Sequence, residues 1–300
     1  MILVTGATGL NGSAVIREFA RRSEPVRALV RSRAKARALE MLPTVEVVEG
    51  DMLRPETLGA ALDGVDRVLM ISSADLRLVE TQCTFIDAAK KAGVHHIVKF
   101  SGLNSAPDSA FLFTRMHGEI ERYLESSGLA WTHLRPSQFM QVYLREVPTI
   151  VAESAFFLPL ENAKLAPVDI EDIAKVAYAL LHTGGHEGKS YNMTGPEALT
   201  MMEIAEQISQ AVGKTVRYVN VAPAERRRAL LAVGIPPAIA DALDVQFSER
   251  RKGSESRVYP GTHDAFGIHS TTFAEFARRN AAVFRGESAR FGIAWGIAQH

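Results

Sequence analysis

The sequence has little of what marks secreted, metal-binding or nucleic-acid-binding proteins. It contains a single cysteine, Cys83, among 300 residues, which excludes an intrachain disulfide framework and any metal site built from several cysteines. We interpret Cys83 as a small buried hydrophobe on a helix. Basic and acidic side chains number 34 each, so no net charge favours nucleic acid or an anionic membrane as a partner.

Long apolar runs are also missing. No stretch approaches the roughly 20 apolar residues that a membrane-spanning helix needs. The N-terminus leads directly into a strand rather than into a basic and then apolar leader, so we expect a cytoplasmic protein. His95, His96 and His133 have no carboxylate or cysteine at ligand spacing, and we therefore predict no metal site.

The chain is, however, 47% hydrophobic, enough for a large core, and its beginning is informative. Ile2–Val4 is a short apolar run, 5–12 (TGATGLNG) is rich in glycine, and Ser13–Arg21 has the apolar spacing of a helix. A strand, a glycine turn and a helix can bind the pyrophosphate of a dinucleotide, because the glycines leave room for it and the helix N-terminus attracts its charge. The GxxGxxG spacing differs from the common GxGxxG, and an ordinary tight turn is the alternative.

Short apolar segments alternate with amphipathic ones through the first half of the chain. This pattern indicates a parallel sheet covered by helices on both faces. The right-handed crossover rule then predicts an α/β protein with a doubly wound Rossmann sheet and a ligand at the carboxyl ends of the strands. The predicted strands are 2–4, 26–30, 45–49, 67–71, 96–100 and 131–134, and the predicted helices are 13–21, 34–41, 56–62, 78–92 and 111–127.

Polar side chains follow several of these strands. Arg31 ends the second strand and Lys35 lies close behind it. An acid for the ribose 2′-hydroxyl of NAD is missing there, and the two bases favour the 2′-phosphate of NADP, unless they are only solvated charges. Asp51, after the third strand, either accepts from the adenine amino group or caps the next helix. Small residues at the ends of the fourth and fifth strands are expected to line the nicotinamide end of the cleft: Ser72, Ser73, Ser101 and Gly102.

Five segments together resemble the NmrA-like branch of the atypical short-chain dehydrogenase/reductases: TGATG at 5–9, VR at 30–31, GD at 50–51, AAKKAGVHHIV at 88–98 and VDIEDIA at 168–174. The resemblance covers most of the chain and weakens beyond about Val221. It implies a nicotinamide cofactor. The expected cofactor contacts are Gly6, Thr8, Gly9, Leu10, Asn11, Gly12, Arg31, Lys35, Asp51, Met52, Ser72, Ser73, Ser101, Gly102 and His117.

The helix expected at 111–127 departs from the pattern of the wider superfamily. Most members use a Tyr-x-x-x-Lys pair there, in which the lysine lowers the pKa of the tyrosine that exchanges a proton with the carbonyl. Here Phe113 stands at the tyrosine position and His117 at the lysine position. This histidine is similar to that of the quinone and triphenylmethane-dye reductases of the branch, for which the resemblance implies direct hydride transfer from NADPH. Reductases of the plant-phenolic type generally keep a lysine at this place.

His117 is the candidate catalytic residue. We predict that it contacts the cofactor ribose or supplies a proton after hydride transfer, since imidazole ordinarily titrates near neutrality. The counterpart of segment 134–140 in the family lies between cofactor and substrate. An aromatic acceptor is expected to stack on Phe139; the alternative is a hydrophobic plug between two lobes. The expected substrate contacts are Ser137, Gln138, Phe139 and Met140.

The remaining chain predicts a smaller C-terminal α/β lobe that covers the cleft. We expect an NAD(P)-binding Rossmann domain over 1–150, with 165–195 packing back on it, and an interleaved substrate-binding lobe over 151–300. The resemblance gives 286–300 no place. The predicted elements are a helix over 169–181, a strand at 190–193, a helix from Thr200 to Val212 with a capping box to Glu203, a strand at 215–221, a helix from Pro223, a mobile loop over 250–261 and a helix over 272–284.

These observations predict an NADPH-dependent reductase that transfers hydride directly to a quinone or a similar conjugated aromatic acceptor. The alternative is a non-catalytic NADP(H)-binding redox sensor, a role that the same branch also contains. A reductase needs a cavity beside the nicotinamide, whereas a sensor can be plugged there, and Phe139 and Phe156 are bulky enough for either. The expected partner is a small aromatic molecule, with neither nucleic acid nor membrane, and the chain is a candidate homodimer.

Overall fold

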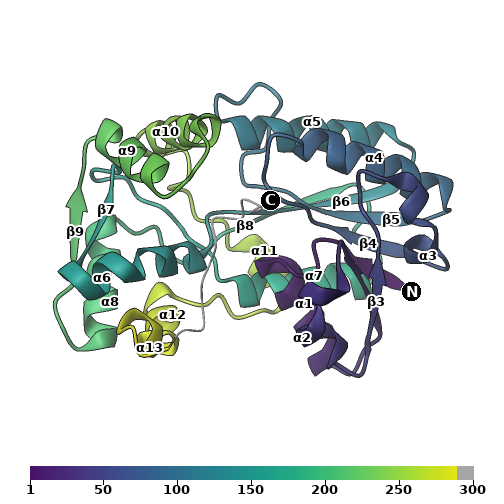
Figure 1. The fold of residues 1–300 in the computed structure, drawn as a ribbon, viewed down its shortest axis with the longest axis horizontal. Coiled ribbons are helices and arrows are strands. Elements are labelled where there is room, and N and C mark those ends of the chain that lie inside the picture. The colour runs from purple at the N-terminus through teal and green to yellow at the C-terminus, as the bar shows by residue number, and fades with distance from the viewer. Residues whose placement is uncertain (289–300) are drawn as a thin grey trace.

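The computed structural model describes residues 1–288 and is built around a seven-stranded sheet (Figure 1). The strand order is β3-β2-β1-β4-β5-β6-β8, and every neighbouring pair is parallel. The strands are β1 (Ile2–Val4), β2 (Val26–Val30), β3 (Val45–Glu49), β4 (Arg67–Met70), β5 (His96–Phe100), β6 (Ala130–Pro136) and β8 (Lys189–Met193). The order reverses between β1 and β4, which opens a crevice at their carboxyl ends. The predicted doubly wound parallel sheet is confirmed.

Helices cover both faces of this sheet, because side chains of a strand point alternately to either side and both sides are apolar. They are α1 (Leu10–Arg21), α3 (Gly59–Leu62), α4 (Leu78–Lys91), α5 (Leu112–Ser126) and α7 (Ile170–His182). Ile97 packs in the cluster that holds side chains of α3, α4 and α5. Val98, the next residue of β5, packs in the cluster of α1 and α7. Figure 1 shows α4 and α5 above the sheet and α1 and α7 below it.

Two predicted helices are shorter than expected. The segment 34–41 forms the 3₁₀ turn η1 (Arg33–Lys35) and then a single α-helical turn, α2 (Arg37–Glu40). The segment 56–62 likewise divides into η2 (Pro55–Thr57) and α3. Pro43 follows closely after the first segment and Pro55 precedes the second, and so few residues cannot offset the cost of nucleating a longer helix.

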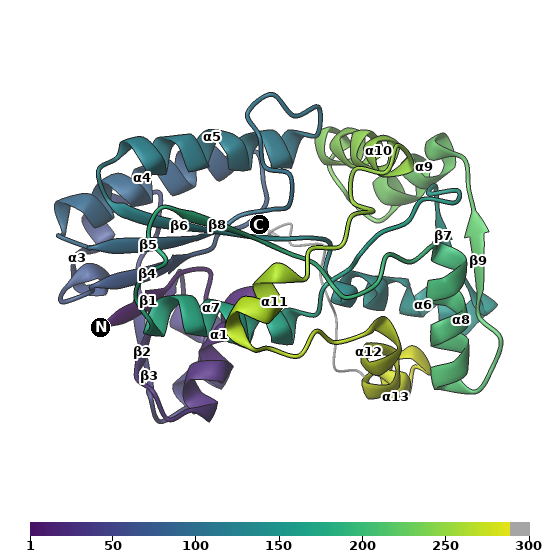
Figure 2. The ribbon, with the colours of Figure 1, turned by 180° about the vertical axis from the view of Figure 1, so that it is seen from behind.

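A second lobe lies beside the sheet, as Figure 2 shows from behind. Its elements are η3 (Met140–Glu146), α6 (Val147–Glu153), β7 (Ala155–Leu158), α8 (Met201–Val212), β9 (Arg217–Asn220), α9 (Pro223–Ala232), α10 (Pro237–Arg251), α12 (Phe273–Arg279) and α13 (Ala281–Phe284). The helix α11 (Gly261–Phe266) lies instead beside β8 and α7 of the first lobe (Figure 2). β7 and β9 form a parallel two-stranded sheet. Phe273, Phe276 and Phe284 are buried in the core of this lobe, as predicted. The predicted α/β character of the lobe is confirmed.

The helix boundaries in this lobe follow local signals where these are strong. The capping box between Thr200 and Glu203 is present at the start of α8, and Gly213 ends that helix with a left-handed φ of 74°. The helix predicted over 272–284 is interrupted at Asn280, which separates α12 from α13. The predictions included no helix corresponding to α10.

The segment predicted as a mobile loop, 250–261, is held by specific contacts. Arg250 belongs to α10 and forms an ion pair with Glu255 at 2.9 Å. The amide of Asn104, in the loop after β5, donates to the carbonyl oxygen of Ser254 at 2.7 Å. The segment therefore connects the second lobe to the loop that follows the fifth strand. None of the helices in the described part of the chain combines the length and apolar character needed to cross a membrane.

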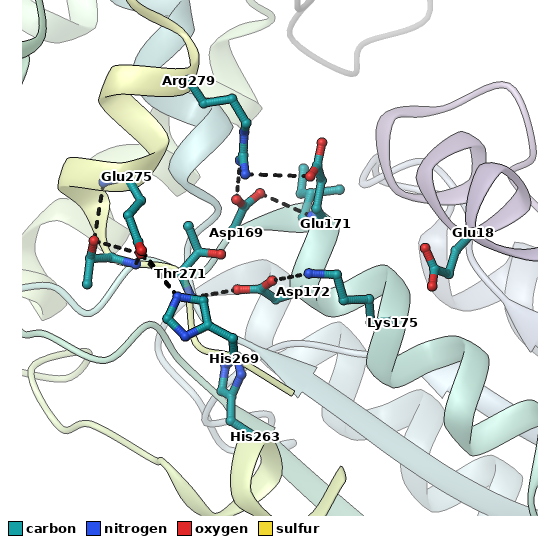
Figure 3. Close-up of polar contacts among 12 residues, drawn as sticks. Glu18, Asp169, Glu171, Asp172, Lys175, His263, His269, Thr271, Glu275 and Arg279 are labelled. Carbon is teal, nitrogen blue, oxygen red and sulfur yellow. Dashed lines mark hydrogen bonds and ion pairs between the residues drawn. The ribbon is translucent and has the colours of Figure 1, made fainter. Parts of the chain in front are cut away.

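The start of α7 joins the two lobes through a buried carboxylate. Asp169 is the N-cap of α7 and is fully buried. One carboxylate oxygen accepts from the side-chain amide of Gln141 in η3 at 2.7 Å and from the backbone N–H of Glu171 at 3.1 Å. The other is paired with Arg279 of α12. Figure 3 shows the guanidinium directed at Asp169 and at Glu171.

We expect Asp169→Asn to lower the free energy of unfolding by about 2 kcal/mol, because an amide leaves a buried donor facing the guanidinium. The matched control is Glu171→Gln, which removes an exposed carboxylate 3.5 Å from the same Arg279. That variant is expected to change stability by less than about 0.5 kcal/mol. Urea unfolding measures both. Equal losses in the two variants would contradict a special role for the buried carboxylate.

Candidate functional site

The glycine turn after β1 is a cradle that side chains would fill. Gly6 has a left-handed φ of 58°, and a Cβ on Gly12 would lie 2.3 Å from the carbonyl oxygen of Gly6. Gly9 closes the turn by donating its N–H to that same oxygen at 2.9 Å. The turn therefore needs glycine at both of its ends, because a side chain at either would collide with the backbone of the chain itself.

The helix after the turn begins at Leu10, three residues earlier than predicted, with Gly9 as its N-cap. The first hydrogen bond of the helix is donated by the N–H of Ser13 to the carbonyl oxygen of Gly9. The N–H groups of Leu10, Asn11 and Gly12 have no partner in the described residues, as expected of a first helical turn. The side-chain oxygen of Asn11 is buried without a hydrogen-bond partner. The free backbone donors at the start of α1 fit the pyrophosphate of a dinucleotide, whereas the Asn11 oxygen is an acceptor and suits a donor of the ligand instead.

Two basic side chains after β2 have no hydrogen-bond or ion-pair partner in the described residues. Arg31 and Lys35 are exposed, and neither side chain has an ion pair or hydrogen bond among residues 1–288. Arg33, between them, is used differently, because it pairs with Glu40 at 3.1 Å and donates to the carbonyl oxygen of Val47 at 2.6 Å. Arg31 and Lys35 can therefore turn to a phosphate, whereas Arg33 holds the loop.

The residues after β3 divide into a turn and a core side chain. Asp51 accepts from the N–H of Leu53 at 3.0 Å, and its own N–H donates to the hydroxyl of Thr57 at 2.9 Å. Asp51 thus stabilises its own turn, while its second carboxylate oxygen stays available. Met52 is 7% exposed and packs with Leu58 in the core between the sheet and α3, α4 and α5. The Met52 side chain is therefore part of the core, which leaves its backbone for the predicted cofactor contact.

Two of the predicted serines are held by neighbouring side chains. Ser72, after β4, accepts from the amide of Gln82 at 2.9 Å. Ser101, after β5, is buried and donates to Glu121 at 2.6 Å, although it still contributes to the wall of the cavity described below. Ser73 is half-buried beside Ser72. The hydroxyl of Ser101 is therefore engaged with α5 in this structure.

His117 and Lys99 form a pair that the sequence did not predict. Nζ of Lys99 lies 2.8 Å from Nδ1 of His117, and Lys99 is fully buried. Burial lowers the pKa of Lys99 to about 7, with the nearby Glu121 acting in the opposite direction. Burial, and then the charge of Lys99, lowers the pKa of His117 well below its ordinary value. The expectation that the imidazole titrates near neutrality is therefore wrong, because His117 is desolvated and stays neutral.

The carboxylate closest to this pair belongs to another network. Arg135 of β6 donates to both oxygens of Glu121 at 2.9 and 2.5 Å, and Ser101 donates to one of them. Glu121 is therefore satisfied by a two-pronged guanidinium contact. The sequence feature that could have pointed to Lys99 is a charged residue inside the strand HIVKF, which is otherwise apolar apart from its first residue.

A cavity of about 350 Å³ opens beside His117, between the two lobes. Phe139, Phe113 and Gly102 of the first lobe line it together with Ile239 and Phe247 of α10. Its polar end carries the ion pairs Arg226–Glu146 at 2.8 Å and Arg250–Glu255 at 2.9 Å. Volume and lining match a site for a small, largely apolar molecule.

Three of the four predicted substrate contacts line this cavity: Ser137, Gln138 and Phe139. The hydroxyl of Ser137 is engaged, since it donates to the carbonyl oxygen of Ala166 at 2.6 Å. Met140 is 1% exposed and packs in the core of the second lobe, so the prediction that its side chain faces the acceptor is not supported. Phe139 also contacts Phe100 edge to face, with ring centroids 6.1 Å apart.

No cluster of three or more His, Cys, Asp or Glu side chains suited to a metal ion occurs within residues 1–288. The sheet topology, the glycine cradle and the crevice at the strand ends define a dinucleotide-binding protein of the Rossmann type. The profile of the NmrA-like family matches residues 1–276. The chain belongs to the NmrA-like family, and the predicted resemblance is confirmed.

Three relatives are reductases by name. The chain is 38% identical over 284 residues to the NAD(P)H azoreductase of Xenophilus azovorans, covering 95% of this chain and 99% of the relative. The NADPH complex of quinone oxidoreductase QOR2 from Escherichia coli is 32% identical with a TM-score of 0.84, covering 93% and 99% of the two chains. Triphenylmethane reductase of Citrobacter sp., solved with NADP(H), is 27% identical with a TM-score of 0.83, covering 94% and 100%.

We expect Lys99→Met to raise stability at pH 7, because the folded wild-type protein must bury an ammonium that methionine replaces with an apolar chain. The advantage should shrink as the pH rises towards 10. Between the folded pKa of about 7 and the unfolded value of about 10.4, the unfolded wild-type chain binds more protons, so its stability rises by up to about 1.4 kcal/mol per pH unit. Urea unfolding at pH 7 to 9.5 measures this difference.

The matched control is Lys91→Met at the exposed end of α4. Its stability should run parallel to that of the wild-type protein over the same pH range. A Lys99→Met curve that also runs parallel to wild type would contradict a buried lysine with a lowered pKa.

Proposed function

We propose that this chain is an NADPH-dependent reductase that transfers hydride directly to a quinone or a similar conjugated aromatic acceptor. The observation that carries the proposal is the cavity of about 350 Å³ beside His117, lined by Phe113 and Phe139. A flat aromatic acceptor can stack on such a wall. The names of the similar azo-, quinone and triphenylmethane reductases support the same class of reaction.

NADP(H) is the proposed cofactor, and when bound it supplies the hydride. Gly6, Gly9 and Gly12 keep side chains out of the turn that receives its pyrophosphate, and the backbone N–H groups at the start of α1 meet that charge. Asn11 is a further proposed contact of the cofactor. Arg31 and Lys35 take the 2′-phosphate. The remaining proposed contacts are Thr8, Leu10, Asp51, Ser72, Ser73, Ser101, Gly102 and His117, with Met52 limited to its backbone.

The reductase works without a Tyr-Lys pair in this proposal. Phe113 stands at the expected tyrosine position and lines the cavity, and phenylalanine has no proton to give. A quinone or a cationic dye accepts hydride without a tyrosine to polarise a carbonyl, so the protein mainly aligns the acceptor and excludes water.

The cavity also separates this proposal from a redox sensor. Phe156, one of two side chains that could plug the cleft, is fully buried in the core of the second lobe instead. Phe139 lies at the wall and leaves the space open. We further propose that 1–150 with 165–195 hold the cofactor and that 151–300 complete the acceptor site, in a cytoplasmic enzyme; the homodimer stays a prediction.

We expect oxidation of NADPH, followed at the nicotinamide absorbance, with benzoquinone, menadione, a cationic triphenylmethane dye or an azo dye. NADPH binding is measured in parallel. Turnover of at least one acceptor is the expected result, because the cavity is sized for an aromatic molecule next to the nicotinamide end. NADPH binding without turnover of any acceptor would refute the reductase and favour a sensor.

Arg31→Glu is expected to weaken NADPH binding about 10- to 100-fold and NADH binding less than about threefold, since repulsion replaces a guanidinium–phosphate pair. The control, Lys90→Glu, changes an exposed charge on α4 and should leave both affinities unchanged. Fluorescence titration with each dinucleotide gives the dissociation constants. Equal losses for NADPH and NADH would remove Arg31 from the phosphate site.

A further inference from the structure

Behind the wall of the cavity, the side chain of Lys99 has one hydrogen-bond partner in the described chain. Its Nζ lies 2.8 Å from Nδ1 of His117, and the lysine itself is fully buried. His117 lines the cavity, and its other nitrogen, Nε2, has no hydrogen-bond partner within residues 1–288. One imidazole therefore joins a buried amine to the acceptor space.

The charged groups around Lys99 leave it without a carboxylate partner. α5 contributes His117 and Glu121, β6 contributes Arg135 and His133, and α4 contributes Cys83. Glu121 is bound by Arg135 and Ser101. His133 contacts Glu125 instead, at 3.0 Å. Burial raises the pKa of the Cys83 thiol to about 11, so this thiol is neutral at neutral pH. The imidazole of His117 is thus the hydrogen-bond acceptor for Nζ of Lys99.

The protonation of Lys99 determines which nitrogen of His117 carries the ring proton. An ammonium has three donors and no acceptor, so Nδ1 must be the acceptor whenever Lys99 is charged. The ring proton then resides on Nε2, the nitrogen left for the cavity. A neutral amine can also accept, and it would no longer hold the imidazole in this tautomer.

We propose that Lys99 is a positioning residue that holds His117 in the Nε2–H tautomer and replaces the proton that His117 gives to a reduced quinone. The inference rests on the proposed function. It assigns a role to a buried lysine that does not itself line the cavity.

The proton transfers balance as follows. Conversion of a quinone to its hydroquinone needs, besides a hydride, one proton. The Nε2–H bond of His117 breaks and an O–H bond forms on the reduced quinone, while Nζ of Lys99 passes one proton to Nδ1. The imidazole stays neutral and the ammonium becomes an amine. After the product leaves, a proton from water in the cavity adds to Nε2 and the Nδ1 proton returns to Lys99.

This relay distinguishes two kinds of acceptor. A quinone needs the proton, whereas a cationic triphenylmethane dye becomes a neutral product through hydride alone. For the wild-type protein, kcat with benzoquinone should fall as the pH rises above about 7, where Lys99 loses its proton. With the cationic dye crystal violet, kcat should stay nearly flat over the same range.

Lys99→Met should lower kcat with benzoquinone at pH 6.5 by at least about 10-fold and remove its alkaline decline. With crystal violet the loss should be at most about twofold, and KM for NADPH should not change. Lys99→Arg keeps a positive donor but does not release a proton, so it should leave quinone turnover low and independent of pH. Lys91→Met, at the surface, is the control for both acceptors.

A second measurement does not depend on turnover. Nitrogen-15 spectra of the imidazoles at pH 6 should show His117 as the Nε2–H tautomer in the wild-type protein and as a mixture in Lys99→Met, with the signal assigned by its loss in His117→Gln. A tautomer unchanged in Lys99→Met would overturn the inference, and so would equal kinetic losses with quinone and dye or no loss with quinone. Wild-type turnover of none of the acceptors named for the proposed function would instead refute that function, and the inference with it.

Discussion

The parallel arrangement of all seven sheet strands is the constraint on which the site depends. Parallel strands bring their carboxyl ends to one edge, so the glycine turn, the loop after β5 and the segment after β6 meet there although they are far apart in sequence. Both faces are occupied by helices, and this edge is the place left for a ligand. The second lobe covers the same edge, and the cavity forms where α10 approaches the start of α5.

The junction of the lobes includes a buried polar contact between two of the apolar cores. One core belongs to the sheet with α1 and α7, and another to η3, α8 and α12. Asp169 lies between them as the N-cap of α7 and accepts from both η3 and α12. A carboxylate at a helix N-terminus gains from the dipole as well as from its partners. The contact therefore fixes α7 and the cavity wall with one buried group.

Much of the fold could be predicted from the sequence because its signals are local. Apolar runs gave the six strands through β6, and the glycines gave the dinucleotide turn. The site required information that is not local. Lys99 meets His117 only because β5 and α5 pack in one particular register, and Met140 faces the core because the chain turns into η3 immediately after Phe139. α10 escaped prediction because its apolar residues form only a weak stripe.

The pairing of Arg135 with Glu121 explains why Lys99 affects His117 at all. Had the carboxylate been free, an ion pair would have kept the lysine charged and directed it away from the imidazole. The guanidinium takes both oxygens of Glu121, so the hydrogen-bond partner of the ammonium is a neutral nitrogen. Burial lowers the pKa of Lys99 to about 7, although the charge of Glu121 acts in the opposite direction. A lysine in this condition destabilises the fold and exchanges its proton near neutral pH. The same desolvation that costs stability thus makes the lysine able to supply a proton beside the acceptor cavity.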